Sequence, residues 1–111
     1  TDGLADGTYT VEVTISGGTG KAKVESPCTI TVSGGSVMAT IRWSSSNYDY
    51  MKVGGVRYDF VNEPGEKSTF IIPVASFDVP MDVIGDTVAM SEPHEIEYTL
   101  TFDSSTIQAV N

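Results

Sequence analysis

The sequence contains few residues of the kinds that most often carry chemistry. It has one cysteine, Cys28, which excludes an internal disulfide and any cysteine-rich zinc site. It has one histidine, His94, which excludes a two-histidine metal site and leaves a hydrolase triad dependent on a single imidazole. The three serines at 44–46 are not part of a nucleophile elbow. These absences predict that the protein is not an enzyme.

Basic residues are scarce as well. Six Lys and Arg against fifteen Asp and Glu give a formal net charge of −9, which disfavours binding to nucleic acids and to anionic membrane surfaces. The sequence has no run of 18 apolar residues, so we expect no membrane insertion by this segment. A basic stretch followed by an apolar one, typical of a signal peptide, is not visible. Because the chain begins at Thr1, we expect a mature or excised segment of a longer protein.

Alternation of apolar and polar residues dominates the chain. Apolar residues make up 40% of the 111 positions, enough for the core of one domain. The alternating runs, typical of half-buried strands, cover residues 9–15, 28–33, 37–43 and 94–102. Further strands are predicted at 21–25, on both sides of Gly54-Gly55, at 70–74 (an edge strand or a bulge, because of Pro73) and at 77–83.

This pattern predicts an all-β fold, an immunoglobulin-like antiparallel β-sandwich of seven to nine short strands. We expect a single domain over residues 1–103, followed by a polar tail or linker at 104–111. Parity places Cys28 and Trp43 on the core face, where Cys28 would be an unreactive thiol.

Aromatic residues gather around a serine-rich loop and the Gly54-Gly55 hairpin. They are Tyr48, Tyr50 and Tyr58, with Met51 among them. One interpretation is a flat platform for a planar apolar ligand or a sugar. The alternative is that they are ordinary strand residues, half of them in the core, since strands are enriched in tyrosine.

His94 and Tyr98 lie four residues apart on one predicted strand. Equal parity puts both on the same face, about 13 Å apart along the strand. Imidazole and phenolate are both competent ligands of haem iron, and Met90 offers a thioether four residues earlier. The alternative is that both simply belong to the core face, and that Met90 fills a gap in the core.

Carboxylates are abundant but dispersed. Those that could supply oxygen ligands for calcium are Asp2, Asp6, Asp78, Asp82 and Asp86. Calcium loops need several oxygens converging on one short turn, so a solvated acidic surface is the better interpretation. Glu95 and Glu97, about 7 Å apart along one strand, have the spacing of an acid/base pair. An exposed strand face explains both more simply.

Four segments, taken in order, resemble the NEAT family, the haem-binding near-iron-transporter domains of Gram-positive cell surfaces. They are Leu4–Val11, Pro27–Gly35, Ser44–Val53 and Met90–Asp103. In that family the first tyrosine of a Tyr-x-x-x-Tyr pair on the last strand ligates haem iron. The matching pair here is His94 and Tyr98, so the resemblance implies a haem pocket with one of these two residues on the iron.

The resemblance also implies a lip that covers the haem, carried in the family by a Ser-x-x-Met or Ser-x-x-Tyr helix. Here the matching residues 16–24 are short and glycine-rich, with no aromatic residue or methionine to close a pocket. Lys21, Lys23 and Lys52 are the local counter-charges for the porphyrin propionates.

Two functions therefore remain open. The first is a non-catalytic haem- or iron-acquisition module of a cell-surface or secreted Gram-positive protein, extracellular or attached to the cell wall. The alternative is a structural or adhesive module that binds a protein or a glycan, the latter through Trp43, Tyr48 or Tyr50. A slot beside His94, Tyr98 and residues 48–51 would favour the first; coverage of these side chains by residues 76–93 would favour the second.

Overall fold

The computed structural model describes residues 3–18, 20–89 and 94–110. They form eight strands, in the range that the sequence predicts. In chain order these are β1 (Gly7–Gly17), β2 (Cys28–Ser33), β3 (Ser36–Arg42), β4 (Tyr48–Val53), β5 (Val56–Asp59), β6 (Thr69–Pro73), β7 (Met81–Thr87) and β8 (His94–Ala109). No helix in these ranges is long and apolar enough to cross a membrane.

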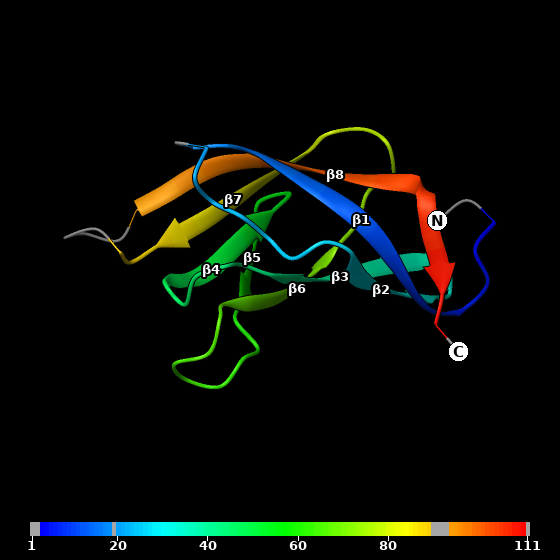
Figure 1. Ribbon diagram of the computed structural model, residues 1–111, viewed down its shortest axis with the longest axis horizontal. Coiled ribbons are helices and arrows are strands. Elements are labelled where there is room, and N and C mark those ends of the chain that lie inside the picture. Colours follow the sequence, from blue (N-terminus) through cyan, green and yellow to red (C-terminus); the bar gives the residue numbers. More distant parts are fainter. Residues whose placement is uncertain (1–2, 19, 90–93, 111) are drawn as a thin grey trace.

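The strands pair antiparallel in the order β5-β4-β7-β8-β1-β2-β3-β6. This sheet folds over on itself, so that β1, β7 and β8 lie in one layer and β2, β3, β5 and β6 in the other (Figure 1). Its two ends approach each other, because Val61 after β5 donates its backbone N–H to the Thr69 carbonyl of β6 at 2.9 Å. The predicted immunoglobulin-like antiparallel β-sandwich is confirmed.

The core lies between the two layers and follows the predicted alternation. Its largest fully buried side chains are Trp43, Phe70, Phe102, Ile30, Ile41, Met51, Ile72 and Leu100. Cys28 is also buried, and this burial raises the pKa of its thiol to about 11, so it stays protonated at neutral pH. The predicted inward orientation of Cys28 and Trp43 is confirmed.

Both predicted hairpins form with the expected registers. Ser33 pairs with Ser36, and Val53 pairs with Val56 across Gly54-Gly55. Gly34, Gly35, Gly54 and Gly55 all have positive φ, the conformation that two-residue hairpin turns require. The strand that carries Pro73 lies at one end of the sheet order, as predicted from its missing N–H.

Three predicted boundaries differ from the structure. Residues 21–25 form only an isolated bridge between Val24 and Trp43 and no strand. The strand expected over 77–83 spans Met81–Thr87. The last strand continues to Ala109, where we expected a tail from residue 104; it bulges and then pairs Ala109 with Tyr9 of β1.

Candidate functional site

A hollow of about 230 Å³ lies between residues 16–24, which we call the lip segment, the loop before β4, and the β7–β8 hairpin. Small, apolar and aromatic side chains line it, with one ammonium group. The lining residues are Lys21, Ala22, Ser44, Ser45, Tyr48, Thr87, Ala89, Ile96 and Tyr98. The hollow thus lies beside Tyr48 and Tyr98, two of the residues that the sequence predicts for a ligand site.

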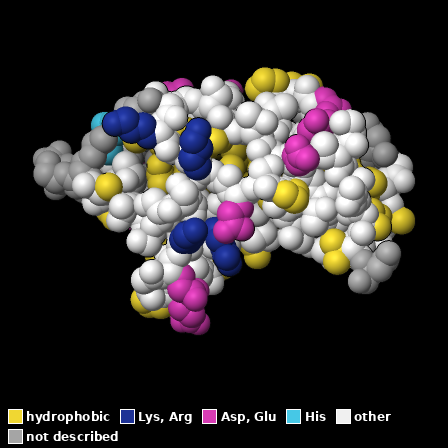
Figure 2. All heavy atoms as spheres, viewed as in Figure 1, with side chains coloured by type: hydrophobic (Ala, Val, Ile, Leu, Met, Phe, Trp, Pro, Cys, Tyr) yellow, Lys and Arg dark blue, Asp and Glu magenta, His cyan; other side chains and the backbone are white. Residues whose placement is uncertain are grey.

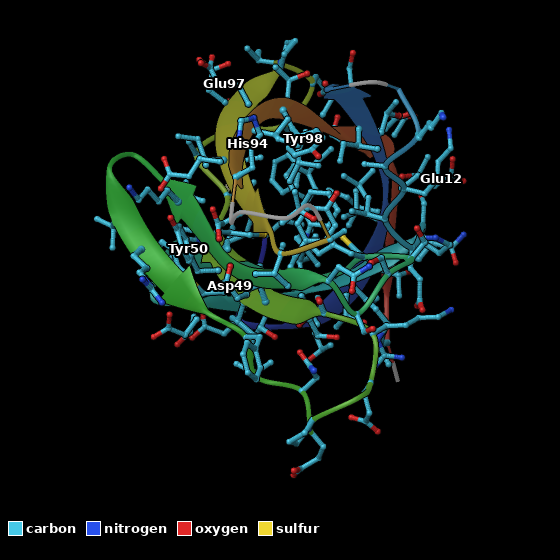
Figure 3. The ribbon with its side chains drawn as sticks, turned by 90° about the vertical axis from the view of Figure 1, so that its left-hand side faces the viewer. Glu12, Asp49, Tyr50, His94, Glu97 and Tyr98 are labelled. Carbon is cyan, nitrogen blue, oxygen red and sulfur yellow. The ribbon has the colours of Figure 1, made fainter. Side chains whose placement is uncertain are left out.

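Tyr98 carries the most distinctive polar group of this hollow. Its side chain points between the two layers, whereas that of the neighbouring Glu97 points away (Figure 3). Tyr98 is only 4% exposed, and its hydroxyl lies 3.0 Å from the Tyr48 hydroxyl, with either one able to donate. Burial, followed by this hydrogen bond, raises the pKa of Tyr98, so the group is a neutral phenol in the ligand-free chain.

Tyr48 is held in place from several sides. Its ring stacks on Trp43 with centroids 4.0 Å apart, and Tyr98 meets Trp43 edge-on at 5.2 Å. Its backbone N–H donates to the buried Ser68 hydroxyl at 3.0 Å. Three aromatic rings from β4, β8 and the residue after β3 therefore form one packed unit at the wall of the hollow.

Two glycines allow the chain to pass close to these rings. A Cβ on Gly85 would lie 3.3 Å from both Trp43 and Tyr48, a tight contact, so glycine at this position lets β7 lie close to the ring stack. Gly18, with φ of +59°, would bring a Cβ to 3.0 Å from the Tyr98 ring. Gly18 thus lets the backbone lie close to the Tyr98 ring.

Positive charge lies at the same end of the molecule. Lys21 lines the hollow, and Lys23 follows it on the lip segment. Figure 2 shows Lys and Arg side chains on the half of this face that also holds the histidine. Lys52, the third predicted counter-charge, is engaged elsewhere, since its ammonium lies 2.9 Å from the Glu95 carboxylate.

The four residues predicted as an aromatic platform do not form one surface. Tyr48 faces the hollow, Met51 is fully buried, and Tyr58, its cross-strand neighbour, is half-buried against the core. Tyr50 lies on the opposite face of β4, where its hydroxyl donates to Glu95 and Arg57 covers its ring at 4.1 Å.

His94 lies at the start of β8 and is exposed. It shares a face of β8 with Ile96 and Tyr98, which line the hollow, but does not line the hollow itself. Met90, the third predicted ligand, lies outside the described residues. Of the residues predicted for glycan stacking, Trp43 is fully buried and Tyr48 stacks on it.

The outer face of the β4–β7–β8 sheet carries a row of polar residues. Tyr50, Asp86 and Glu95 are cross-strand neighbours there. Hydrogen bonds from Tyr50 and Lys52 hold the pKa of Glu95 below its ordinary value, and the bond to Glu95 raises the pKa of Tyr50 to about 12. The exposed Glu95 and Glu97 are thus parts of a strand surface and do not line a cleft together.

Within residues 3–18, 20–89 and 94–110, no three His, Cys, Asp or Glu side chains are grouped so that they could hold a metal ion. Asp78, one of the carboxylates considered for calcium, instead accepts hydrogen bonds from the Ser104 backbone and hydroxyl. Both lie at the opposite end of the molecule, beside a larger hollow of about 620 Å³ that also contains Leu4, Phe77 and Ile107. Among the described residues, none of those predicted for the haem site lines that larger hollow.

The sequence did not predict several of the residues that line the 230 Å³ hollow. Ala22, Thr87 and Ala89 carry no chemical signal, and only the folded chain brings them beside Tyr98. A glycine within a strand, such as Gly85, is the one local sign that another group approaches closely there.

Comparison with solved structures gives the fold a name. The NEAT5 domain of IsdX2, a B. anthracis hemophore, in complex with heme superposes with a TM-score of 0.71 over 92% of this chain and 99% of that domain, at 15% identity. This chain has the NEAT fold. A mutant of NEAT5, also with heme, gives a TM-score of 0.72 over 93% and 99%, again at 15% identity. No family model and no curated protein matches the sequence.

Proposed function

We propose that this NEAT-fold chain is a non-catalytic haem-binding module of a cell-surface or secreted protein. The observation that carries the proposal is the hollow between the lip segment and the β7–β8 hairpin, with the Tyr98 phenol buried beside it. It occurs in the same fold as NEAT5, whose solved structures contain heme.

The residues around the hollow fit such a ligand. Ala22, Ala89 and Ile96 offer apolar contacts to a flat ring system, and Tyr98 offers an oxygen ligand. Bound haem would supply an iron that accepts a phenolate or an imidazole. For Tyr98 to act as a phenolate its proton must leave, and the Tyr48 hydroxyl is placed to donate a hydrogen bond to the resulting anion.

Size and charge suggest how the ligand sits. At about 230 Å³ the hollow is smaller than the usual ~300–1,000 Å³ of enclosed small-molecule sites, so one edge of a porphyrin would stay exposed. Lys21 and Lys23 on the lip segment would pair with propionates that the net charge of −9 otherwise repels. His94 is the second candidate ligand, from the exposed start of β8.

The test is a hemin titration of the purified chain, followed by absorbance in the Soret region. We expect a saturable one-to-one shift that Tyr98→Phe abolishes and that His94→Ala weakens. Tyr50→Phe is the matched control, because it removes a tyrosine hydroxyl from the opposite face of the same sheet. A featureless titration at micromolar protein would overturn the proposal and leave the structural or adhesive module that binds a protein or glycan.

A further inference from the structure

Two carboxyl groups meet at the seam between β4 and β7 on the outer face of the sheet. Asp86 is only 3% exposed although it is the cross-strand neighbour of Tyr50 and Glu95 on the outer face. Its Oδ2 is buried without a hydrogen-bond partner, and so is Oδ1 of Asp49. Buried polar atoms are rarely left unpaired, so two orphaned oxygens on neighbouring acids require an explanation.

The pairing of the strands brings these two acids together. Tyr48 pairs with Thr87 and Tyr50 with Asp86, so Asp49 is the additional residue of a β-bulge. Asp49 and Asp86 thus both lie at the point where the register shifts. A carboxylate accepts hydrogen bonds but cannot donate one, so two ionised groups would leave both oxygens unpaired.

We propose that Asp49 and Asp86 share one proton in the folded chain, so that the seam beside the hollow is a proton-binding site. A single proton gives each orphaned oxygen a partner and removes one of two like charges. The arrangement does not depend on haem binding, and the inference goes beyond the proposed function.

The negative charge beside the pair favours retention of the proton. Glu95 of β8 is the cross-strand neighbour of Asp86 and adds negative charge. The Tyr50 hydroxyl on β4 donates its hydrogen bond to Glu95. Lys52 is paired with Glu95, and Arg57 of β5 is paired with Asp59 at 2.7 Å.

His94 is the partner of Thr87 and lies on the other face of the sheet. Burial first, then the proximity and charge of Asp49 and the charge of Glu95, raise the pKa of Asp86 to about 6, while the Tyr50 hydroxyl acts in the opposite direction.

The proton affects the stability of the seam in a defined direction. A carboxyl whose pKa is raised on folding binds more protons in the folded state between its ordinary pKa of 3.8 and about 6. Stability therefore falls as the pH rises through this window and stays lower above it. Tyr48 and Thr87, the immediate neighbours of the two acids, line the hollow, so the added charge appears directly behind its wall.

The first experiment measures the site itself. Carboxyl ¹³C shifts of the labelled full chain are followed by NMR from pH 3 to 8. We expect the Asp86 carboxyl to titrate with an apparent pKa near 6, and Asp82 on the same face of β7 serves as the exposed reference. Titration of Asp86 near its ordinary value of 3.8 would overturn the proposal.

The second experiment follows thermal unfolding against pH. We expect the wild-type Tm to fall by about 5 °C between pH 5 and 7.5. Asp86→Asn supplies the donor permanently, so its Tm should rise at pH 7.5 and lose this slope, whereas Asp82→Asn should keep it.

Retention of the slope in Asp86→Asn would contradict the shared proton. If Ca²⁺ or Mg²⁺ instead raised the wild-type Tm at pH 7.5, and Asp86→Asn abolished that rise, the pair would bind a cation and the proposal would be wrong.

Discussion

Tyr48 and Tyr50, two residues apart on β4, have opposite environments. Tyr48 lies in the wall of the hollow, stacked on Trp43 and bonded to the Tyr98 hydroxyl. Tyr50 lies on the outer face, with Arg57 over its ring and Glu95 at its hydroxyl. Simple alternation would place both on one face, and the bulge at Asp49 is what separates them.

The difference shows that the two faces of this sheet are held by different forces. The inner face depends on packing of aromatic rings, which water does not weaken. The outer face depends on charged and hydrogen-bonded groups, which respond to pH and salt. The candidate ligand site lies on the inner face, and the candidate proton site lies directly behind it.

The largest expected effect compares alanine at the two tyrosines. Tyr48→Ala removes the stack on Trp43, and we expect it to lower the free energy of unfolding by about 2 kcal/mol. Tyr50→Ala should cost clearly less, because its contacts are on the solvent-facing side. Urea denaturation of both variants measures this difference. Equal losses would show that the outer face contributes as much to stability as the ring stack.

A smaller effect is expected when only the inner hydroxyl pair is broken. Tyr98→Phe keeps the edge-on contact with Trp43 but leaves Tyr48 without its partner, at a cost of about 1 kcal/mol. Tyr9→Phe, which removes a bond to the Ala5 carbonyl at the exposed chain surface, is the matched control. The same denaturation measurement applies, and an effect of Tyr98→Phe no larger than that of the control would mean that the hydroxyl pair adds nothing to packing.

The smallest effect concerns the loss of stability at acidic pH that arises from the outer face. Because Tyr50 and Lys52 hold the pKa of Glu95 below 4.5, its contribution is present above that pH and is lost as the pH falls through the lower folded value. Glu95→Gln should therefore flatten the dependence of Tm on pH below 4.5, and Glu97→Gln should not. If Glu95→Gln leaves the dependence of Tm on pH below 4.5 unchanged, the two hydrogen bonds of Glu95 are not maintained in solution.

Local sequence was sufficient for most of the strands. Alternation in residues 28–33 and 37–43, joined by a glycine turn, predicted a hairpin that forms in the expected register. Alternation gave the wrong face or the wrong strand end where a β-bulge adds an extra residue to a strand. The bulges at Asp49 and after Asp103 have no sequence signal of their own. Thr106 illustrates the second case: its hydroxyl accepts the Glu12 N–H, 94 positions away, and so keeps β8 on the sheet where a tail was expected.

The candidate site was predictable to a similar degree. Alternation and the resemblance to NEAT domains both predict Tyr98 as a ligand; the structure places it beside the hollow, and its role as a ligand stays a prediction. His94 was expected beside it but lies exposed. Tyr50 and Met51 were grouped with Tyr48 because they are neighbours in the chain, whereas the bulge and the burial of Met51 separate them.

The sequence by itself determined the all-β architecture, the inward face of each regular strand and the two glycine hairpins, because these depend on the period of the side chains and on φ at single residues. Only the tertiary structure decided that Gly18 lies against Tyr98, that Trp43 and Tyr48 pack beside Gly85, and that Asp49 lies next to the Tyr50–Asp86 pair. These contacts join segments far apart in the chain, so they depend on how the sheet folds over and where its register shifts.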